Sequence, residues 1–480
     1  MSLINYDNRI DKLFLKLIFI FGIIFIFVIP PFQMADEDSH FKKAYLVSNL
    51  NFFPETNAQG EIGNYIPKAI LDFESSHRYL MNNINEKYDY TKFYADTTTN
   101  ANYEEKVFTQ YSTSKTHPLL YLPQAFFMFW VKFFSYIFGF SNWGMLSPVT
   151  YMYAGRLGNL LFYTVCIYFS LKLIPFFKRL VLLIAIMPMS LGLSASLNYD
   201  SMVISMSILI TSFIMYLAYN NSVSFITKKK FLLLCLLSVF LIELKQVYYP
   251  LLLLLFLIPG TKFTSPKDKI IKIFLILLSG IVAHLLWILI SKSGSAAPGD
   301  GVYIKDQFIF ILTHPFSYIE ILMRTIIDLR FFYLNSFIGN LGWLDTNLPP
   351  LFIFMFMTLL CIVAIVDVNK EIVITNKNKI FFALIFCSIF ILVETSLYLI
   401  WTSIPEVGGV GYEIVSGVQG RYFIPFSIIG FILLYSNRLF NDYKERISRI
   451  INGILMPFCY SSCVLTLLFI IARYWIPASQ

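Results

Sequence analysis

The sequence predicts an all-α protein that crosses a membrane many times. Of its 480 residues, 57% are hydrophobic and only 14% are charged, and the mean hydropathy is +0.67. Soluble domains are closer to half apolar and a quarter charged. The apolar runs recur at about 17–25 residues, the length at which a helix crosses a bilayer. The lysines and arginines gather in short loops between these runs, which indicates a polytopic membrane protein rather than a nucleic-acid-binding one.

About eleven spans are predicted from these runs. The first ends at Pro30-Pro31 and lacks a small-x-small cleavage site, so we interpret it as a span and not as a signal peptide. The positive-inside rule places the N-terminus and the basic loops in the cytoplasm and the C-terminus outside. The predicted spans are residues 13–29, 150–171, 180–197, 201–219, 231–245, 247–260, 271–291, 350–366, 380–401, 422–437 and 452–472.

The spans divide the chain into alternating membrane and loop regions. Residues 117–140 are apolar and nearly long enough to cross, but a crossing there would place Lys228–Lys230 outside. We therefore predict an interfacial or re-entrant helix at this place. The regions are residues 1–29 (N-terminus and first span), 30–149 (first periplasmic loop), 150–291 (spans 2–7), 292–349 (second periplasmic loop) and 350–480 (spans 8–11), the last with a glycine-rich loop at 402–421.

An acidic motif follows the first span. Asp36, Glu37, Asp38 and His40 come directly after the prolines that end this span. A carboxylate near low-dielectric surroundings has a raised pKa and can act as a general base. We select Asp36, Glu37 and His40 as candidate catalytic residues; the alternative is a hydrated loop that is merely acidic.

Cationic side chains on the outer side form a second group of candidates. Lys245 is predicted at the tip of a short helical hairpin, at a depth where charge is costly and usually functional. Arg421 lies outside against the positive-inside rule, where a guanidinium could bind a phosphate in a bidentate manner. The alternatives are snorkelling toward lipid headgroups and a Glu243–Lys245 pair. The candidate substrate-binding residues here are Arg156, Lys245, Tyr248, Gln419 and Arg421.

Three further polar residues draw attention. His117 begins the predicted interfacial helix, and Asp200 lies in a short outer turn; both are candidate substrate-binding residues. The alternatives are an aromatic interfacial belt for the first and an ordinary turn for the second. Glu394 is an intramembrane carboxylate with no evident partner in the sequence, and we assign it no role.

The sequence contains no motif for a soluble cofactor or nucleotide. A phosphate-cradling glycine loop, a dinucleotide fingerprint, HExxH and GxSxG are all absent. The six cysteines lie in or next to apolar runs, which disfavours disulfides and a zinc site. Mg²⁺ or Mn²⁺ could bind beside Asp36, Glu37 and Asp38. We favour a mechanism without metal or other cofactor, because the basic residues already offset phosphate charge.

Several motifs, in their order along the chain, carry a family resemblance. They are Pro30-Pro31-Phe32-Gln33 with Asp36-Glu37 and His40, His117-Pro118 through Gln124, Gly155-Arg156-Leu157 with Asn159, Asp200-Ser201, and Gln419-Gly420-Arg421-Tyr422-Phe423 with Pro425. The chain resembles a bacterial family of multi-spanning membrane proteins. That family is similar to the integral-membrane glycosyltransferases of the GT-C fold. In size and layout the chain also resembles the phage-type, serotype-converting O-antigen glucosyltransferases.

The resemblance implies a reaction on the periplasmic face of a bacterial inner membrane. A hexose, glucose by analogy, would move from undecaprenyl phosphate to a hydroxyl of O-antigen or a related lipopolysaccharide glycan. Asp36 or Glu37 would be the base, with His40 sharing the proton, and Lys245 and Arg421, with Arg156, would hold the phosphate. Membrane lipid, a small flippase and a donor-synthesising transferase would be functional partners, and no nucleic acid is expected.

Two rival functions remain open from the sequence. A transporter or flippase for a lipid-linked glycan would use the same cations for phosphate but would need no base. Such proteins usually contain internal repeats, and none is evident in this sequence. The second rival function is that of a non-catalytic scaffold for polysaccharide assembly. Glycan transfer by the purified protein distinguishes the enzyme from both.

Overall fold

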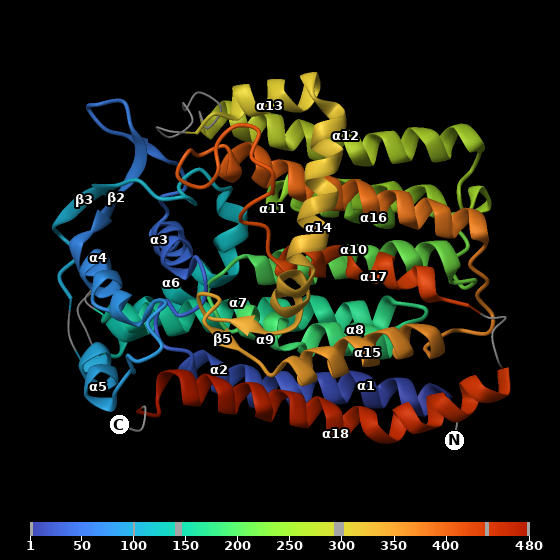
Figure 1. Cartoon of the computed structure of the whole chain (residues 1–480), viewed down its shortest axis with the longest axis horizontal. Helices are drawn as coiled ribbons and strands as arrows, with labels where there is room; N and C mark the ends of the chain where they lie inside the picture. The colour runs from blue at the N-terminus through green and yellow to red at the C-terminus, as the bar shows by residue number, and fades with distance from the viewer. Residues whose placement is uncertain (1–2, 99–100, 140–145, 292–301, 437–440, 478–480) are drawn as a thin grey trace.

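The computed structural model describes residues 3–98, 101–139, 146–291, 302–436 and 441–477. Long helices and several short ones lie side by side along one direction (Figure 1). They are α1 (Leu3–Leu17), α2 (Ile23–Val28), α7 (Pro148–Leu173), α8 (Lys178–Ile186), α9 (Pro188–Ser194), α10 (Asp200–Tyr219), α11 (Lys228–Leu244), α12 (Pro266–Ser291), α15 (Pro350–Val366), α16 (Asn376–Leu397), α17 (Ser427–Phe431) and α18 (Asn441–Tyr474). Two 3₁₀ helices, η4 (Gln246–Leu257) and η8 (Gly420–Phe426), complete this bundle.

The described helices make this an all-α membrane protein. Four of them are long and apolar enough to cross a bilayer: Asp200–Tyr219, Pro266–Ser291, Asn376–Thr402 and Lys444–Tyr474. Three shorter apolar helices are Gln246–Leu257, Pro350–Val366 and Gly420–Leu434. Every predicted span falls on helical structure, but the count of about eleven crossings stays a prediction.

Proline explains where three predicted spans are not continuous α-helices. Pro188 starts α9 and separates it from α8, because proline has no N–H to continue the helix. Pro250 lies within η4 and Pro425 within η8, and both segments are 3₁₀ helices. A 3₁₀ helix rises about 2.0 Å per residue, so twelve residues extend about 24 Å instead of the about 18 Å of an α-helix. The short second half of the Lys245 hairpin therefore extends further than its length suggests.

The segments of the first predicted outer loop gather at one end of the bundle, which we call the outer end, beside the C-terminus, and the N-terminus lies at the other end (Figure 1). Opposite ends are what an odd number of crossings requires, and which side is cytoplasmic stays a prediction. The helices here are α3 (Glu37–Ser48), α4 (Lys68–Ser75), α5 (Tyr90–Thr98) and α6 (Leu122–Ile137). Strands β1 (Glu55–Thr56), β2 (Ile62–Pro67) and β3 (Lys106–Thr109) form an antiparallel sheet in that order, and β4 (Asn340–Leu341) pairs with β5 (Thr346–Asn347).

Helix α6 packs antiparallel on the outer part of α7. Gly158 of α7 lies so close to α6 that a Cβ there would be 2.3 Å from the carbonyl oxygen of Pro123, and one at Gly155 would be 2.5 Å from Met128. Both glycines lie in the first half of α7, so α6 begins partway along the bundle and runs toward the start of α7. This geometry favours an interfacial or re-entrant helix for the segment.

Two helices of the second outer loop close over the bundle. Helix α13 (Ile304–Thr313) leads into α14 (Pro315–Ile338), which runs across the long helices and not along them (Figure 1). The backbone of η8 contacts α14 closely, since a Cβ at Gly420 would be 1.9 Å from the Tyr333 carbonyl oxygen. Residues 292–301, the start of the predicted loop, lie outside the described residues.

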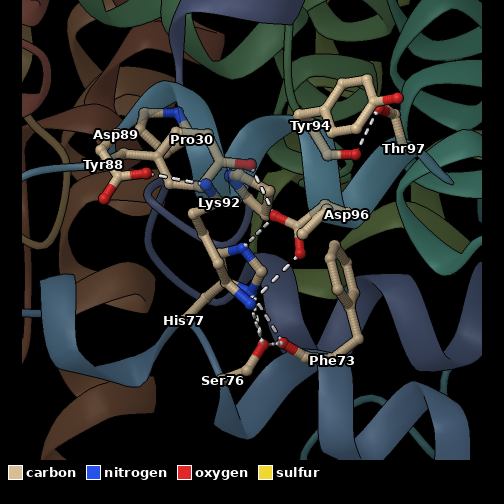
Figure 2. A network of polar contacts seen from close by, with 12 residues as sticks. Pro30, Phe73, Ser76, His77, Tyr88, Asp89, Lys92, Tyr94, Asp96 and Thr97 are labelled. Carbon is tan, nitrogen blue, oxygen red and sulfur yellow. Dashed lines mark hydrogen bonds and ion pairs between the residues drawn. The ribbon is translucent and has the colours of Figure 1, made fainter. Parts of the chain in front are cut away.

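A buried polar network attaches α5 to its neighbours (Figure 2). Asp96 accepts a hydrogen bond from Tyr88 at 2.6 Å, and its Oδ2 lies 2.8 Å from Nε2 of His77. The other ring nitrogen of His77 lies 2.8 Å from the Phe73 carbonyl oxygen, and the Tyr88 backbone N–H donates to the Tyr474 carbonyl. Because His77 is fully buried with both nitrogens in contact, we interpret this histidine–carboxylate pair as structural.

Candidate functional site

Four charged side chains from distant parts of the chain meet at the outer end of the bundle. Arg421 donates from Nη2 to Oδ2 of Asp36 at 2.9 Å. Its Nε lies 3.5 Å from Oδ2 of Asp200, and Nζ of Lys245 lies 3.7 Å from the other oxygen of Asp200. Asp200 therefore lies between the two cations, and Asp36 is on the far side of Arg421.

The local backbone explains how each of the four reaches the site. Asp36 precedes α3 in the left-handed conformation, with φ of 65°, and its carboxylate does not cap the helix. Aspartate is among the residues that tolerate this conformation, which is often found at functional positions. Asp200 is the first residue of α10, and Lys245 is extended between α11 and η4. Arg421 is in the first turn of η8, where Gly420 allows close packing under α14.

Arg421 is buried and Lys245 is partly buried, with 28% of its side chain exposed, whereas Asp36 is accessible. The side chain of Arg421 is 3% exposed and that of Asp36 is 51% exposed. Nε of Arg421 is buried and makes no hydrogen bond among the described residues apart from its 3.5 Å ion pair with Asp200. Oε1 of Gln419, two residues earlier, is also buried and has no hydrogen-bond partner among the described residues. A buried polar atom without a partner costs about 1–3 kcal/mol. The site thus contains one donor and one acceptor that a polar ligand could use.

Tyrosines surround the two cations. Nζ of Lys245 lies 4.2 Å from the ring centroid of Tyr422, and the guanidinium of Arg421 lies 5.2 Å from the same ring. The hydroxyl of Tyr248 donates to the backbone carbonyl of Tyr422 at 2.9 Å. Tyr248 therefore orients the segment that carries Arg421, so it is a positioning residue here.

His40 adjoins the four charges but is neutral at pH 7. Its Nδ1 lies 2.8 Å from the hydroxyl of Tyr121, and its ring contacts Tyr199 edge-on at 4.8 Å. Burial lowers its pKa to about 4, although the nearby Asp36 and Asp200 act in the opposite direction. We therefore expect His40 to orient groups as a neutral imidazole.

The protein is expected to lose stability as the pH falls from about 6.5 to about 4, partly through His40. Because the pKa of folded His40 is about 4 and that of an unfolded histidine is about 6.5, the unfolded state binds more protons in this window. A shift of this size corresponds to a contribution on the order of 3 kcal/mol. Thermal unfolding in detergent at several pH values measures it, with His40→Gln as the comparison. A variant with the same pH dependence as the wild type would contradict it.

Glu37 and Arg156 form a separate buried ion pair, which corrects their predicted roles. Arg156 donates to both carboxylate oxygens of Glu37, at 2.8 and 2.6 Å, and both side chains are fully buried. Its remaining donors reach the carbonyls of Ile26, Ile29 and Pro30. Because every donor of Arg156 has a partner and Glu37 is inaccessible, neither is placed to bind phosphate or to take a proton. Asp36 remains as the candidate base.

An amide framework holds the outer turns together. Asn159 donates to the Ser196 carbonyl at 2.6 Å and accepts from Gln124 of α6. Asn198 donates to the Ala35 carbonyl at 2.9 Å, which attaches the turn before Asp200 to the acidic motif. Several motif residues thus have a structural role, because they fix the positions of Asp36 and Asp200 relative to each other.

His117 lies outside this group, contrary to the prediction. Its Nδ1 accepts from the Leu119 backbone N–H at 3.1 Å, and its ring lies 4.3 Å from that of Trp287 in α12. Burial lowers its pKa to about 4. The side chain caps a short 3₁₀ turn and packs on a membrane helix.

Glu394 has a hydrogen-bond partner that the sequence did not reveal, because the hydroxyl of Tyr333 donates to it at 3.0 Å.

A cavity of about 550 Å³ adjoins Asp36. It lies between α3, α4 and β3, and its lining includes Asp36, Asp38, Lys42, Glu74 and Trp343. These residues come from loop regions without periodic patterns, and sequence reasoning did not select Lys42, Glu74 or Trp343. Within the described ranges, no three His, Cys, Asp or Glu side chains are grouped so that they could hold a metal ion.

Comparison with known proteins gives one result. The family model described as "Predicted membrane protein (DUF2142)" matches residues 19–429. The chain belongs to this family. The match includes every candidate site residue, from Asp36 to Arg421, and ends before α18. Neither the curated proteins nor the solved structures contain a match to this chain.

Proposed function

We propose that this protein is a membrane glycosyltransferase. It moves a hexose from a polyprenyl-phosphate donor to a hydroxyl of a cell-surface glycan on the periplasmic face. The single observation that carries the proposal is the pairing of a half-exposed carboxylate, Asp36, with the buried cation Arg421, 2.9 Å away. A base and a phosphate-binding group are thereby adjacent, as sugar transfer from a lipid phosphate requires.

The donor phosphate binds beside Arg421 and Lys245, on the side of these cations that Asp200 leaves open. Apart from its 3.5 Å ion pair with Asp200, the buried Nε of Arg421 has no hydrogen-bond partner among the described residues, so a phosphate oxygen can accept from it. Asp200 contacts both cations and keeps them oriented before the ligand binds, which reduces the reorganisation needed in the reaction. The side-chain amide oxygen of Gln419 also has no hydrogen-bond partner among the described residues, and it can accept a hydrogen bond from a sugar hydroxyl.

Transfer is a single displacement at the anomeric carbon. Asp36 takes the proton of the acceptor hydroxyl as its oxygen bonds to this carbon. The bond from carbon to the phosphate oxygen breaks, and its electron pair leaves with the polyprenyl phosphate. Arg421 and Lys245 stabilise the charge that develops on the leaving group. One displacement inverts the anomeric configuration. The basic residues supply the charge compensation, so the mechanism needs no metal.

The alternative is a transporter or flippase for a lipid-linked glycan. It would also bind the phosphate through Arg421 and Lys245. A carboxylate that is half exposed and lies beside a cavity of about 550 Å³ favours chemistry with an external hydroxyl, and we therefore place the enzyme first.

Changes at the two cations are expected to weaken donor binding by about 10- to 100-fold, since hydrogen bonds to charged groups contribute about 1.5–3 kcal/mol. Arg421→Lys keeps the charge but loses the planar fork, and Lys245→Met loses the charge. Binding of undecaprenyl-phosphate-glucose to protein in nanodiscs measures the effect. Lys68→Met, at a half-exposed lysine outside the site, is the matched control. Unchanged affinity in both site variants would identify the cations as membrane anchors.

A further inference from the structure

The cavity beside Asp36 has fixed aromatic surfaces. Nε1 of Trp343 donates to the Phe32 carbonyl at 2.9 Å, which holds the indole in place. The hydroxyl of Tyr111 donates to Asn64 at 2.8 Å, which holds the second ring. Both residues belong to the cavity lining. Rigid aromatic rings offer apolar contact area without a large cost in conformational entropy, and the C–H faces of sugar rings pack against such surfaces.

The polar part of the lining offers both donors and acceptors. Glu74 accepts from Lys42 at 2.6 Å and from Arg78 at 2.6 Å, and Lys42 also lies 3.5 Å from Asp38. Charges of opposite sign thus neutralise each other within the lining. The lining contains the carboxylates of Asp36, Asp38 and Glu74 and the cations Lys42 and Arg78, and it therefore gives no net attraction for an anion. Such a lining suits an uncharged, hydroxyl-rich ligand.

The volume and position of the cavity fit an acceptor site. Ligand sites commonly enclose about 300–1,000 Å³, and this cavity has about 550 Å³. Asp36 belongs to the lining and also contacts Arg421. A ligand in the cavity would therefore lie next to this carboxylate, while Arg421 and Lys245 are not part of the lining.

We infer that this cavity binds the acceptor, and that the acceptor is an uncharged oligosaccharide whose hydroxyl is presented to Asp36. Its place in the reaction rests on the proposed function, but binding of the oligosaccharide requires no donor. The two cations recognise the lipid phosphate, and Trp343 with the Lys42–Glu74–Arg78 network recognises the glycan.

Binding of oligosaccharides to the purified full chain, without donor lipid, tests this inference. The probes are a panel of neutral trisaccharides, a trisaccharide of galacturonic acid and a peptide rich in serine and threonine. We expect the neutral trisaccharides to bind at least about tenfold more tightly than the acidic one. No binding of neutral trisaccharides, or preferential binding of the acidic sugar or the peptide, would overturn the assignment.

Two substitutions at one position separate ring stacking from folding. Trp343→Ala and Trp343→Phe both remove the hydrogen bond to Phe32, but only the first removes the aromatic surface. We expect the Kd to rise about tenfold in Trp343→Ala and at most about threefold in Trp343→Phe. Equal affinity in the alanine variant and the wild type would overturn the inference. If Trp343→Ala loses affinity for the oligosaccharide but keeps its affinity for the donor lipid, the inference is supported. If the wild type binds the oligosaccharide but not the donor lipid, only the proposed function is contradicted.

Discussion

Asp36→Asn is expected to reduce sugar transfer by about 10²–10⁴-fold, the usual effect of losing a general base. Asparagine has nearly the same shape as aspartate and tolerates the left-handed backbone at this position, where φ is 65°. It cannot take the proton of the acceptor hydroxyl. The amount of protein and its melting temperature should stay close to those of the wild type, because the Asp36 side chain is 51% exposed.

Transfer rates at saturating donor and acceptor measure this effect, since they separate chemistry from binding. Asp72→Asn, at an exposed carboxylate on α4, is the matched control and should leave the rate unchanged. A rate within a few-fold of the wild type in Asp36→Asn would remove this residue from the mechanism.

Glu37→Gln, one position along the chain, should act on folding. Removing one partner of a buried ion pair costs about 3–5 kcal/mol, because the other charge stays buried without compensation. Here the remaining charge would be that of Arg156, whose side chain is fully buried. The Leu197 backbone N–H would also lose the charge of its acceptor. We expect a strongly lowered melting temperature and a small yield of monodisperse protein in detergent.

An exposed ion pair gives the comparison for this effect. Lys68 and Glu105 form a pair whose side chains are 50% and 65% exposed, and Glu105→Gln should lower the stability by less than about 1 kcal/mol. A Glu37→Gln variant with normal stability and no transfer would contradict the structural role, and would identify Glu37 as the base.

From the sequence, the four charged residues that meet in the candidate site could be selected, but different roles could not be assigned to the neighbours Asp36 and Glu37. Arg421 and Lys245 were identifiable because a charge on the outer side or within a short hairpin is costly and needs a reason. Asp36 and Glu37 could not be separated, since they are adjacent in the sequence. The left-handed backbone at Asp36 directs its side chain toward Arg421, while Glu37 begins α3 and faces the bundle interior.

The parts of the structure that the sequence did not predict lie where periodicity gives no information. Trp343 and Glu74 come from the two long outer loops, and only tertiary packing brings them into one cavity. His117 was selected for its chemistry, but its environment beside Trp287 depends on how α12 packs. In the membrane region apolar run lengths located the helices, whereas the 3₁₀ geometry of η4 and η8 depends on prolines and on packing under α14.

Sugar transfer by the purified protein alone tests the central claim most directly. The protein in nanodiscs is given undecaprenyl-phosphate-glucose with a labelled glucose and a bacterial surface polysaccharide. The account predicts that label appears in the polysaccharide with inverted anomeric configuration, and that free undecaprenyl phosphate accumulates in equal amount. If label stays on the lipid while the same protein in vesicles moves the intact lipid-linked sugar between leaflets, the protein is a flippase and the account is contradicted.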